Sequence, residues 1–127
     1  MSTLKVNAFQ DTSGKGWYPA RAWVNFNGVG TVAIRDDGGV SSITDNSSGN
    51  YSANFDNTQS NANYCCNFSA TDSGSGPSQT NGYVYGSWKR GSTAVVYATG
   101  SIRVGMGYPA NASFYDQSHV NISIVGD

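Results

Sequence analysis

Residues Ala22 to Ile34, with the sequence AWVNFNGVGTVAI, contain two short alternating patterns on either side of a glycine-rich turn. Apolar side chains recur at every second position before the turn and again after it. A period of two is typical of a β-strand that buries one face. This stretch therefore predicts a β-hairpin.

The turn of this hairpin sets which side chains face each other. If Gly28-Val29-Gly30 is the loop, with Gly30 in the left-handed conformation, Phe26 pairs with Val32 on the buried face. A two-residue turn at Asn27-Gly28 would place small or polar residues on that face instead. We expect the three-residue loop.

Alternation continues through the rest of the chain, with polar turn clusters between the alternating segments. No stretch of 11 residues shows a helical period, and one further strand is expected at Leu4–Phe9. The pattern predicts an all-β chain: an antiparallel β-sandwich of about eight short strands over residues 22–127, after an N-terminal connecting segment at residues 1–21. The expected inward side chains are Tyr51, Ala53, Phe55, Tyr64, Cys66, Phe68, Ala70, Tyr83, Tyr85, Ile102, Val104, Met106, Tyr108, Val120, Ile122 and Ile124.

Composition excludes several classes of function. The net charge is −1 and 12% of residues are charged, so the chain lacks the basic surface of a nucleic-acid-binding protein. No apolar run approaches the ~20 residues that span a bilayer, and no membrane insertion is expected. The polar residues are mainly Asn, Ser, Thr and Gly, accompanied by eight Tyr and three Trp. This mixture favours strands and tight turns, and it is also common at binding surfaces.

The two cysteines, Cys65 and Cys66, are adjacent in an alternating segment. Neighbouring side chains of a strand point to opposite faces, so a disulfide between them would be strained. We expect two free thiols. Stability must then come from the core or from oligomerisation.

The order of the strands indicates which loops lie together. When consecutive strands run antiparallel, their connections alternate between the two ends of the sandwich. The connections at Gly28–Gly30, Asn46–Ser48, Thr71–Thr80 and Pro109–Ser118 should then share the end opposite the N-terminal segment. This arrangement assumes a single strand over Thr93–Tyr108; a true turn at Gly100 would move the last connection to the other end.

A catalytic function would require paired acids, because glycoside hydrolysis normally uses two carboxyl groups about 5–9.5 Å apart. Most aspartates here stand beside Gly, Asn or Ser, where the side chain commonly bonds the backbone of its own turn. Asp72 and Asp116, on connections expected at the same end, are the pair to test. The other candidates are Asp36, Asp37, Asp45 and Asp56.

Cofactor and metal sites are not expected. His119 is the single histidine, and no cluster of His and Cys with zinc-ligand spacing accompanies it. Neither a calcium-loop spacing nor a nucleophile motif around a serine occurs. The chain is therefore expected to bind rather than to catalyse.

Three segments carry a family resemblance: ARAWVNFNGVGTVAIR, VSSITDNSSGNYSANF and the closing VNISIVGD. They are similar to a domain at the C-terminal end of bacteriophage tail fibres. The resemblance extends from Ala20 to the C-terminus and is strongest in Arg21–Phe55. It implies a virion protein at the fibre tip, usually a homotrimer joined to the rest of the tail fibre, that touches a glycan or protein on the host cell surface.

The resemblance supplies no contact residues, so these are chosen from loops and aromatic side chains. Flat rings beside short polar groups suit a sugar surface, and trimer contacts are also rich in aromatic residues. For receptor contacts we choose residues of the two long distal connections, namely Asp72, Ser73, Ser75, Gln79, Tyr108, Asn111, Tyr115 and Asp116. For the trimer interface we choose Trp17, Tyr18 and Trp23. The alternatives are a polysaccharide depolymerase and a purely structural fibre module.

Overall fold

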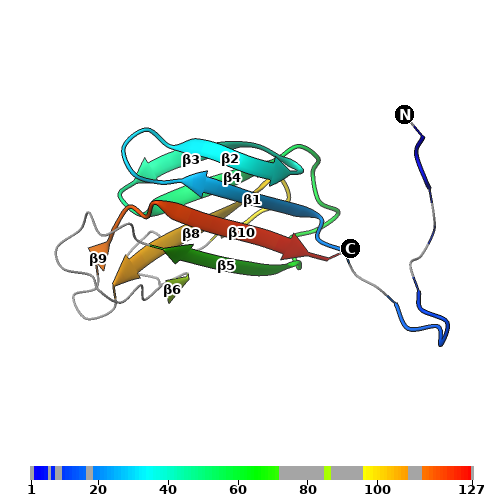
Figure 1. Ribbon diagram of the computed structural model, residues 1–127. Helices are drawn as coiled ribbons and strands as arrows, with labels where there is room; N and C mark the ends of the chain where they lie inside the picture. Colours follow the sequence, from blue (N-terminus) through cyan, green and yellow to red (C-terminus); the bar gives the residue numbers. More distant parts are fainter. Residues whose placement is uncertain are drawn as a thin grey trace.

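The computed structural model of the chain describes residues 2–5, 7, 10–16, 19–71, 85–86, 96–108 and 113–126. In these ranges the regular elements are all β-strands, and every pairing between strands is antiparallel. The strands form two sheets that lie one over the other (Figure 1). The predicted antiparallel sandwich is confirmed, whereas the trimer stays a prediction.

The first sheet has the strand order β2-β1-β10-β5. Its strands are β1 (Ala22–Asn27), β2 (Ala33–Gly38), β5 (Cys65–Thr71) and β10 (His119–Val125). The last strand of the chain therefore lies at the centre of the sheet, beside the first strand of the sandwich. The pairing of β1 with β10 joins residues that are about a hundred positions apart in the sequence.

The second sheet has the path β3-β4-β8-β6, and two further short strands also pair with β8. Its members are β3 (Val40–Ser47), β4 (Asn50–Phe55), β6 (Tyr85–Gly86), β7 (Val96–Tyr97), β8 (Ser101–Tyr108) and β9 (Ser113–Phe114). β8 is thus the strand around which this sheet is organised.

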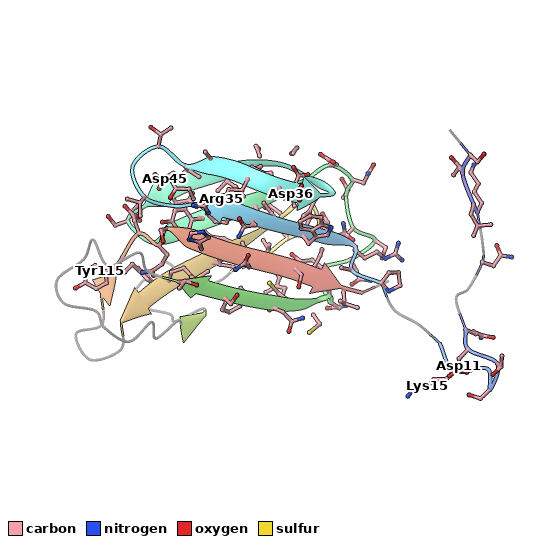
Figure 2. All side chains as sticks on the ribbon, viewed as in Figure 1. Asp11, Lys15, Arg35, Asp36, Asp45 and Tyr115 are labelled. Carbon is pink, nitrogen blue, oxygen red and sulfur yellow. The ribbon has the colours of Figure 1, made fainter. Side chains whose placement is uncertain are left out.

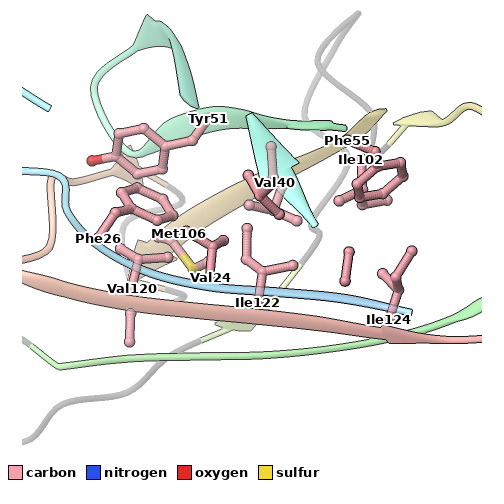
Figure 3. Close-up of a cluster of buried hydrophobic side chains, with 14 of the residues drawn as sticks. Val24, Phe26, Val40, Tyr51, Phe55, Ile102, Met106, Val120, Ile122 and Ile124 are labelled. Atoms are coloured by element: carbon pink, nitrogen blue, oxygen red, sulfur yellow. The ribbon is translucent and has the colours of Figure 1, made fainter. Parts of the chain in front are cut away.

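The core lies between the sheets and follows the expected alternation. Buried side chains come from every second position of β1, β4, β8 and β10 (Figure 3). Phe26 and Tyr51 meet across the sheets edge to face, with ring centroids 5.1 Å apart, a contact worth about 0.5–1.5 kcal/mol. Of the other predicted core aromatics, Phe55 and Tyr64 are buried and Phe68 is half-buried. Tyr83 and the side chains of Tyr85 and Tyr108 lie outside the described part of the chain.

The hairpin of β1 and β2 differs from its predicted register. Gly30 has φ +66°, so the left-handed glycine is confirmed. Phe26 pairs with Ile34 rather than Val32, which makes the loop longer than predicted. The side chain of Asn27 explains this difference, because its amide donates to the carbonyl of Val29 at 2.7 Å and holds the longer loop closed.

The cysteines behave as expected from their positions on β5. Both thiols are free; Cys65 is exposed, and Cys66 is half-buried against the core. Burial raises the pKa of the Cys66 thiol to about 11, and the neighbouring Cys65 adds to the effect. At neutral pH Cys66 is therefore a packing residue rather than a nucleophile.

The assumption of one strand over Thr93–Tyr108 with a bend at Gly100 is wrong for the described residues 96–108. Gly100 lies in a true turn between β7 and β8, and the backbone N–H of Ala98 donates to the carbonyl of Ser101 at 3.1 Å across it. The backbone reverses there because β7 pairs back onto β8. β6 and β7 are both antiparallel to β8 and therefore run in the same direction.

The N-terminal segment lies beside the sandwich and extends away from it (Figure 1). Of the predicted strand Leu4–Phe9, the described residues 4, 5 and 7 are not in a strand, and Leu4 is exposed. The prediction is wrong for these residues because no neighbouring strand pairs with them. Further on, Asp11 closes a turn by accepting from the backbone N–H groups of Ser13 and Lys15.

Candidate functional site

One end of the sandwich gathers three connections that are far apart in the sequence. We call it the distal end; it comprises the β1–β2 loop (28–32), the β3–β4 turn (48–49) and residues 115–118. The backbone N–H of Gly28 donates to the carbonyl of Gln117 at 2.9 Å, and that of Met106 donates to the carbonyl of Gly49 at 2.6 Å. Figure 2 shows Asp45 and Tyr115 at this end, with Asp11 and Lys15 far from it.

The predicted clustering of connections is confirmed for the residues that the structure describes. β5 also ends there, because the hydroxyl of Ser118 donates to the carbonyl of Thr71 at 2.9 Å. The last connection stays at the distal end despite the true turn at Gly100. The reason is the shared direction of β6 and β7, which leaves β8 running toward the same end as predicted.

Tyr51 and Asp116 hold these connections together. The Tyr51 hydroxyl lies 2.9 Å from Asp116 Oδ1 and 3.0 Å from the carbonyl oxygen of Gly28, and donates its proton to these two acceptors. The same Oδ1 accepts from the backbone N–H of Gly49 at 2.7 Å. One half-buried carboxylate therefore links the β3–β4 turn, β4 and the segment before β10.

Electrostatics keep this phenol protonated. Burial raises the pKa of Tyr51 well above its ordinary value, and the adjacent Asp116 carboxylate raises it further. The alternating pattern placed Tyr51 in the core but did not identify its partner. A buried phenol usually has a hydrogen-bond partner, so the sequence indicated that Tyr51 has one without indicating which residue it is.

Gly49 permits the close approach at this turn. Its φ is +63°, and a Cβ there would meet the backbone of Met106 and Tyr115 within about 2.6 Å. Any other residue would both adopt an unfavourable conformation and push the last connection away. The glycine is therefore part of the packing of the distal end.

The β1–β2 loop forms the exposed part of the distal end. Asn27 fixes this loop through its amide, which bonds the backbone of Val29 in both directions. The Val29 side chain is 37% exposed at the tip. The sequence analysis placed Val29 in the turn but did not choose it as a contact residue, because contacts were sought in the two long connections and among the aromatic side chains.

A β-bulge directs Arg35 toward the same end. Asn25 pairs with Asp36 and Phe26 with Ile34, so Arg35 is the extra residue of β2. Its Nη2 donates to the carbonyl of Ser118 at 2.6 Å. The bulge thus connects the edge strand to the end of the last connection.

The predicted contact residues are placed as follows. Tyr115 and Asp116 lie at the distal end and are half-buried, and the backbone of Tyr108 ends β8 there. Trp23 is on the outer face of the first sheet and 41% exposed. Their predicted roles in receptor binding and trimer contact stay predictions. Outside the described residues lie Trp17, Tyr18, Asp72, Ser73, Ser75, Gln79 and Asn111.

Asp11, Asp36 and Asp116 accept hydrogen bonds from backbone N–H groups. Asp36 lies within β2 and pairs with Asn25, so the turn role expected of it is not observed; its Oδ1 accepts from the N–H of Asp37 at 3.0 Å. Asp116, one member of the acid pair to test, is engaged by Tyr51 and Gly49, and its partner Asp72 lies outside the described residues. The described part of the chain brings together no group of three or more metal-ligating side chains.

Comparisons with known proteins leave the family open. No family model matches the chain, and neither a curated protein nor a solved structure shows significant similarity to it. Among the described residues, no helix is long and apolar enough to cross a membrane.

Proposed function

We propose that this chain is the receptor-binding tip of a bacteriophage tail fibre. It would bind a glycan or protein on the host cell surface without catalysis, as a homotrimer attached to the rest of the fibre and exposed outside the cell. The resemblance of the three sequence segments supports the family. The geometry of the distal end supports a binding role.

The observation that carries the proposal is the rigid support of the distal loops. Tyr51 and Asp116 fix the base of the distal end by hydrogen bonds between segments 65 residues apart. Loops on such a support can vary in sequence while their positions stay fixed, which is the usual arrangement of binding sites on β-sandwiches. Asp116 has a structural role in this arrangement, and exposed residues such as Val29 would touch the receptor.

Weak contacts are sufficient for attachment by such a tip. A site with millimolar affinity contributes about −4 kcal/mol. Three tips in one fibre, and several fibres on one particle, would raise the effective concentration and turn weak binding into firm attachment. A rigid scaffold with few charges suits this task, because binding would not depend strongly on salt.

The test uses the chain biotinylated at its N-terminus and displayed on fluorescent streptavidin, so that weak binding benefits from multivalency. We expect saturable labelling of some strains in a panel of bacteria. Val29→Asp at the distal end should reduce labelling at least tenfold, as should removal of residues 73–79. Thr58→Asp, which adds the same charge to an exposed loop at the opposite end, should leave labelling unchanged.

Thermal unfolding must show that all variants are folded. Labelling that survives both distal changes would place the binding surface elsewhere. A folded, multivalent wild-type chain that labels no strain would support the purely structural role. Release of reducing sugar from bacterial polysaccharide, abolished by Asp72→Ala, would instead support the depolymerase.

A further inference from the structure

An open groove of about 290 Å³ lies on the outer face of the first sheet, away from the distal loops. It crosses β1, β10 and β5. It is lined by Trp23 on β1, by Asn121, Ile122 and Ser123 on β10, and by Asn67, Phe68 and Ser69 on β5. Its volume is close to the ~300 Å³ at which small-molecule sites begin.

The groove arises from the order of side-chain sizes along one row of the sheet. Ser123 pairs with Trp23 on one side and with Asn67 on the other. Paired residues point to the same face, so a small serine stands between an indole and an amide. The row therefore has two high sides, Trp23 and Asn67, and a low centre at Ser123.

The indole of Trp23 occupies a defined position. A Cβ on Gly38, its partner on β2, would meet the Nε1, Cε2 and Cδ1 atoms of this ring. Glycine therefore provides the space into which the indole leans. Because the indole already occupies this position without a ligand, it loses little conformational entropy when a ligand binds to it.

The polar groups of the groove fall into two sets. Asn121 is fixed, because its Oδ1 accepts from Asn25 at 2.6 Å and its amide donates to the hydroxyl of Ser69 at 3.3 Å. The side chains of Asn67 and Ser123 make no hydrogen bond to any residue that the structure describes. An amide and a hydroxyl are thus free to bind a ligand beside the exposed indole.

We propose that this groove binds one pyranose unit of a neutral glycan. The apolar C–H face of the sugar would lie against Trp23, and its hydroxyl groups would bond Asn67 and Ser123. None of the side chains that shape the groove is charged, which disfavours acidic and basic ligands. This site is separate from the distal end, and the inference does not rest on the proposed function.

The face is poorly suited to a second copy of the chain. Among the described residues, Trp23 is the one large apolar side chain of the first sheet that is exposed. Its surroundings are Asn and Ser side chains, whereas stable subunit contacts have a continuous apolar centre. This argument assigns Trp23 to a ligand instead of the predicted trimer interface.

The test is a titration of the ¹⁵N-labelled chain with methyl β-glucopyranoside, methyl β-galactopyranoside and methyl α-mannopyranoside. The indole N–H signal of Trp23 is assigned by its loss in Trp23→Phe. We expect at least one glycoside to shift this signal saturably, with a dissociation constant on the order of 1 mM. Glucuronic acid should bind more weakly, because no cation shapes the groove.

Two variants separate binding in the groove from a general effect. Ser123→Leu fills the low centre of the row and should weaken binding at least tenfold while leaving the indole in place. Ser47→Leu, a matched change of an exposed serine on β3, should not change the affinity.

Three results would overturn the proposal. The first is the absence of a saturable shift with all three glycosides in the folded chain. The second is a shift that survives Ser123→Leu. The third is a Trp23 signal that changes with protein concentration alone, together with a larger sedimentation coefficient, which would show that a second copy covers the face. The cell labelling described above can fail without affecting any of these readouts.

Discussion

The hydroxyl of Tyr51 lies 2.9 Å from the carboxylate of Asp116, although 65 residues separate them in the sequence. The contact joins a core strand to the last connection of the chain. It leaves the buried phenol satisfied, and no buried side-chain nitrogen or oxygen of the described residues lacks a partner. The stability of the distal end should therefore depend on this pair.

Tyr51→Phe keeps the ring in the core and removes the hydroxyl. The carbonyl of Gly28 and the carboxylate of Asp116 then lose the phenol as a donor, although Asp116 keeps that of Gly49, so we expect a loss of about 1–3 kcal/mol in the free energy of unfolding. Urea denaturation measures this loss. Combined with Asp116→Ala, the two changes should be less than additive, because each removes the same contact; strict additivity would show that the two groups act independently.

Gly49 and Gly30 form a matched pair, because both have φ near +65° but differ in the space around them. Alanine at Gly30 meets open space, so its cost should be that of the left-handed conformation, about 1 kcal/mol. Alanine at Gly49 also meets the backbone of Met106 and Tyr115, and it should cost at least twice as much. Equal losses in thermal unfolding would mean that the turn at Gly49 is not tightly packed.

The chain should lose stability in alkali in two stages. Burial raises the pKa of the Cys66 thiol to about 11, whereas a thiol in the unfolded chain titrates near 9. The unfolded state therefore loses this proton first, and stability decreases from about pH 9 as the pH rises through the folded pKa. Tyr51, Tyr64 and Tyr97, whose pKa values are also raised by burial, add a second decrease above about pH 10.

Urea midpoints between pH 7 and pH 11 check this prediction. Cys66→Ala should remove the early decrease, and Tyr51→Phe should reduce the later one. A midpoint that stays constant to pH 11 would contradict the assigned pKa shifts.

The two thiols should react at different rates. Cys65 is exposed, whereas Cys66 is half-buried and has a raised pKa. With a disulfide reagent at pH 8, we expect one fast thiol and one slow thiol per chain. Cys65→Ser should remove the fast phase without a large change in stability. If the fast phase instead disappears in Cys66→Ala, Cys66 is the exposed thiol and Cys65 the half-buried one, which would contradict the structure.

Much of the scaffold follows from short stretches of sequence. The side-chain period of a strand is local, so the alternation in Val120, Ile122 and Ile124 was enough to identify the buried face of β10. The left-handed conformation at Gly30 is also local, because glycine is the residue that adopts it without strain. The alternating direction of strands then placed the described connections at the correct end, although the rule itself fails at β6 and β7, which run in the same direction.

Strand register and polar partners required the folded chain. Phe26 pairs with Ile34 instead of Val32 because the Asn27 side chain supports a longer loop and a bulge at Arg35 resets the pairing. Neither effect alters the period of two, so the alternating pattern did not reveal them.

The sequence by itself determined that this chain is an antiparallel β-sandwich with its apolar side chains inside, because each strand carries its own alternation. The tertiary structure alone decided that Asp116 supports the distal end and that Trp23 borders a groove. Both features depend on strands brought together from distant parts of the chain, and distances of this kind leave no mark on the local pattern of residues.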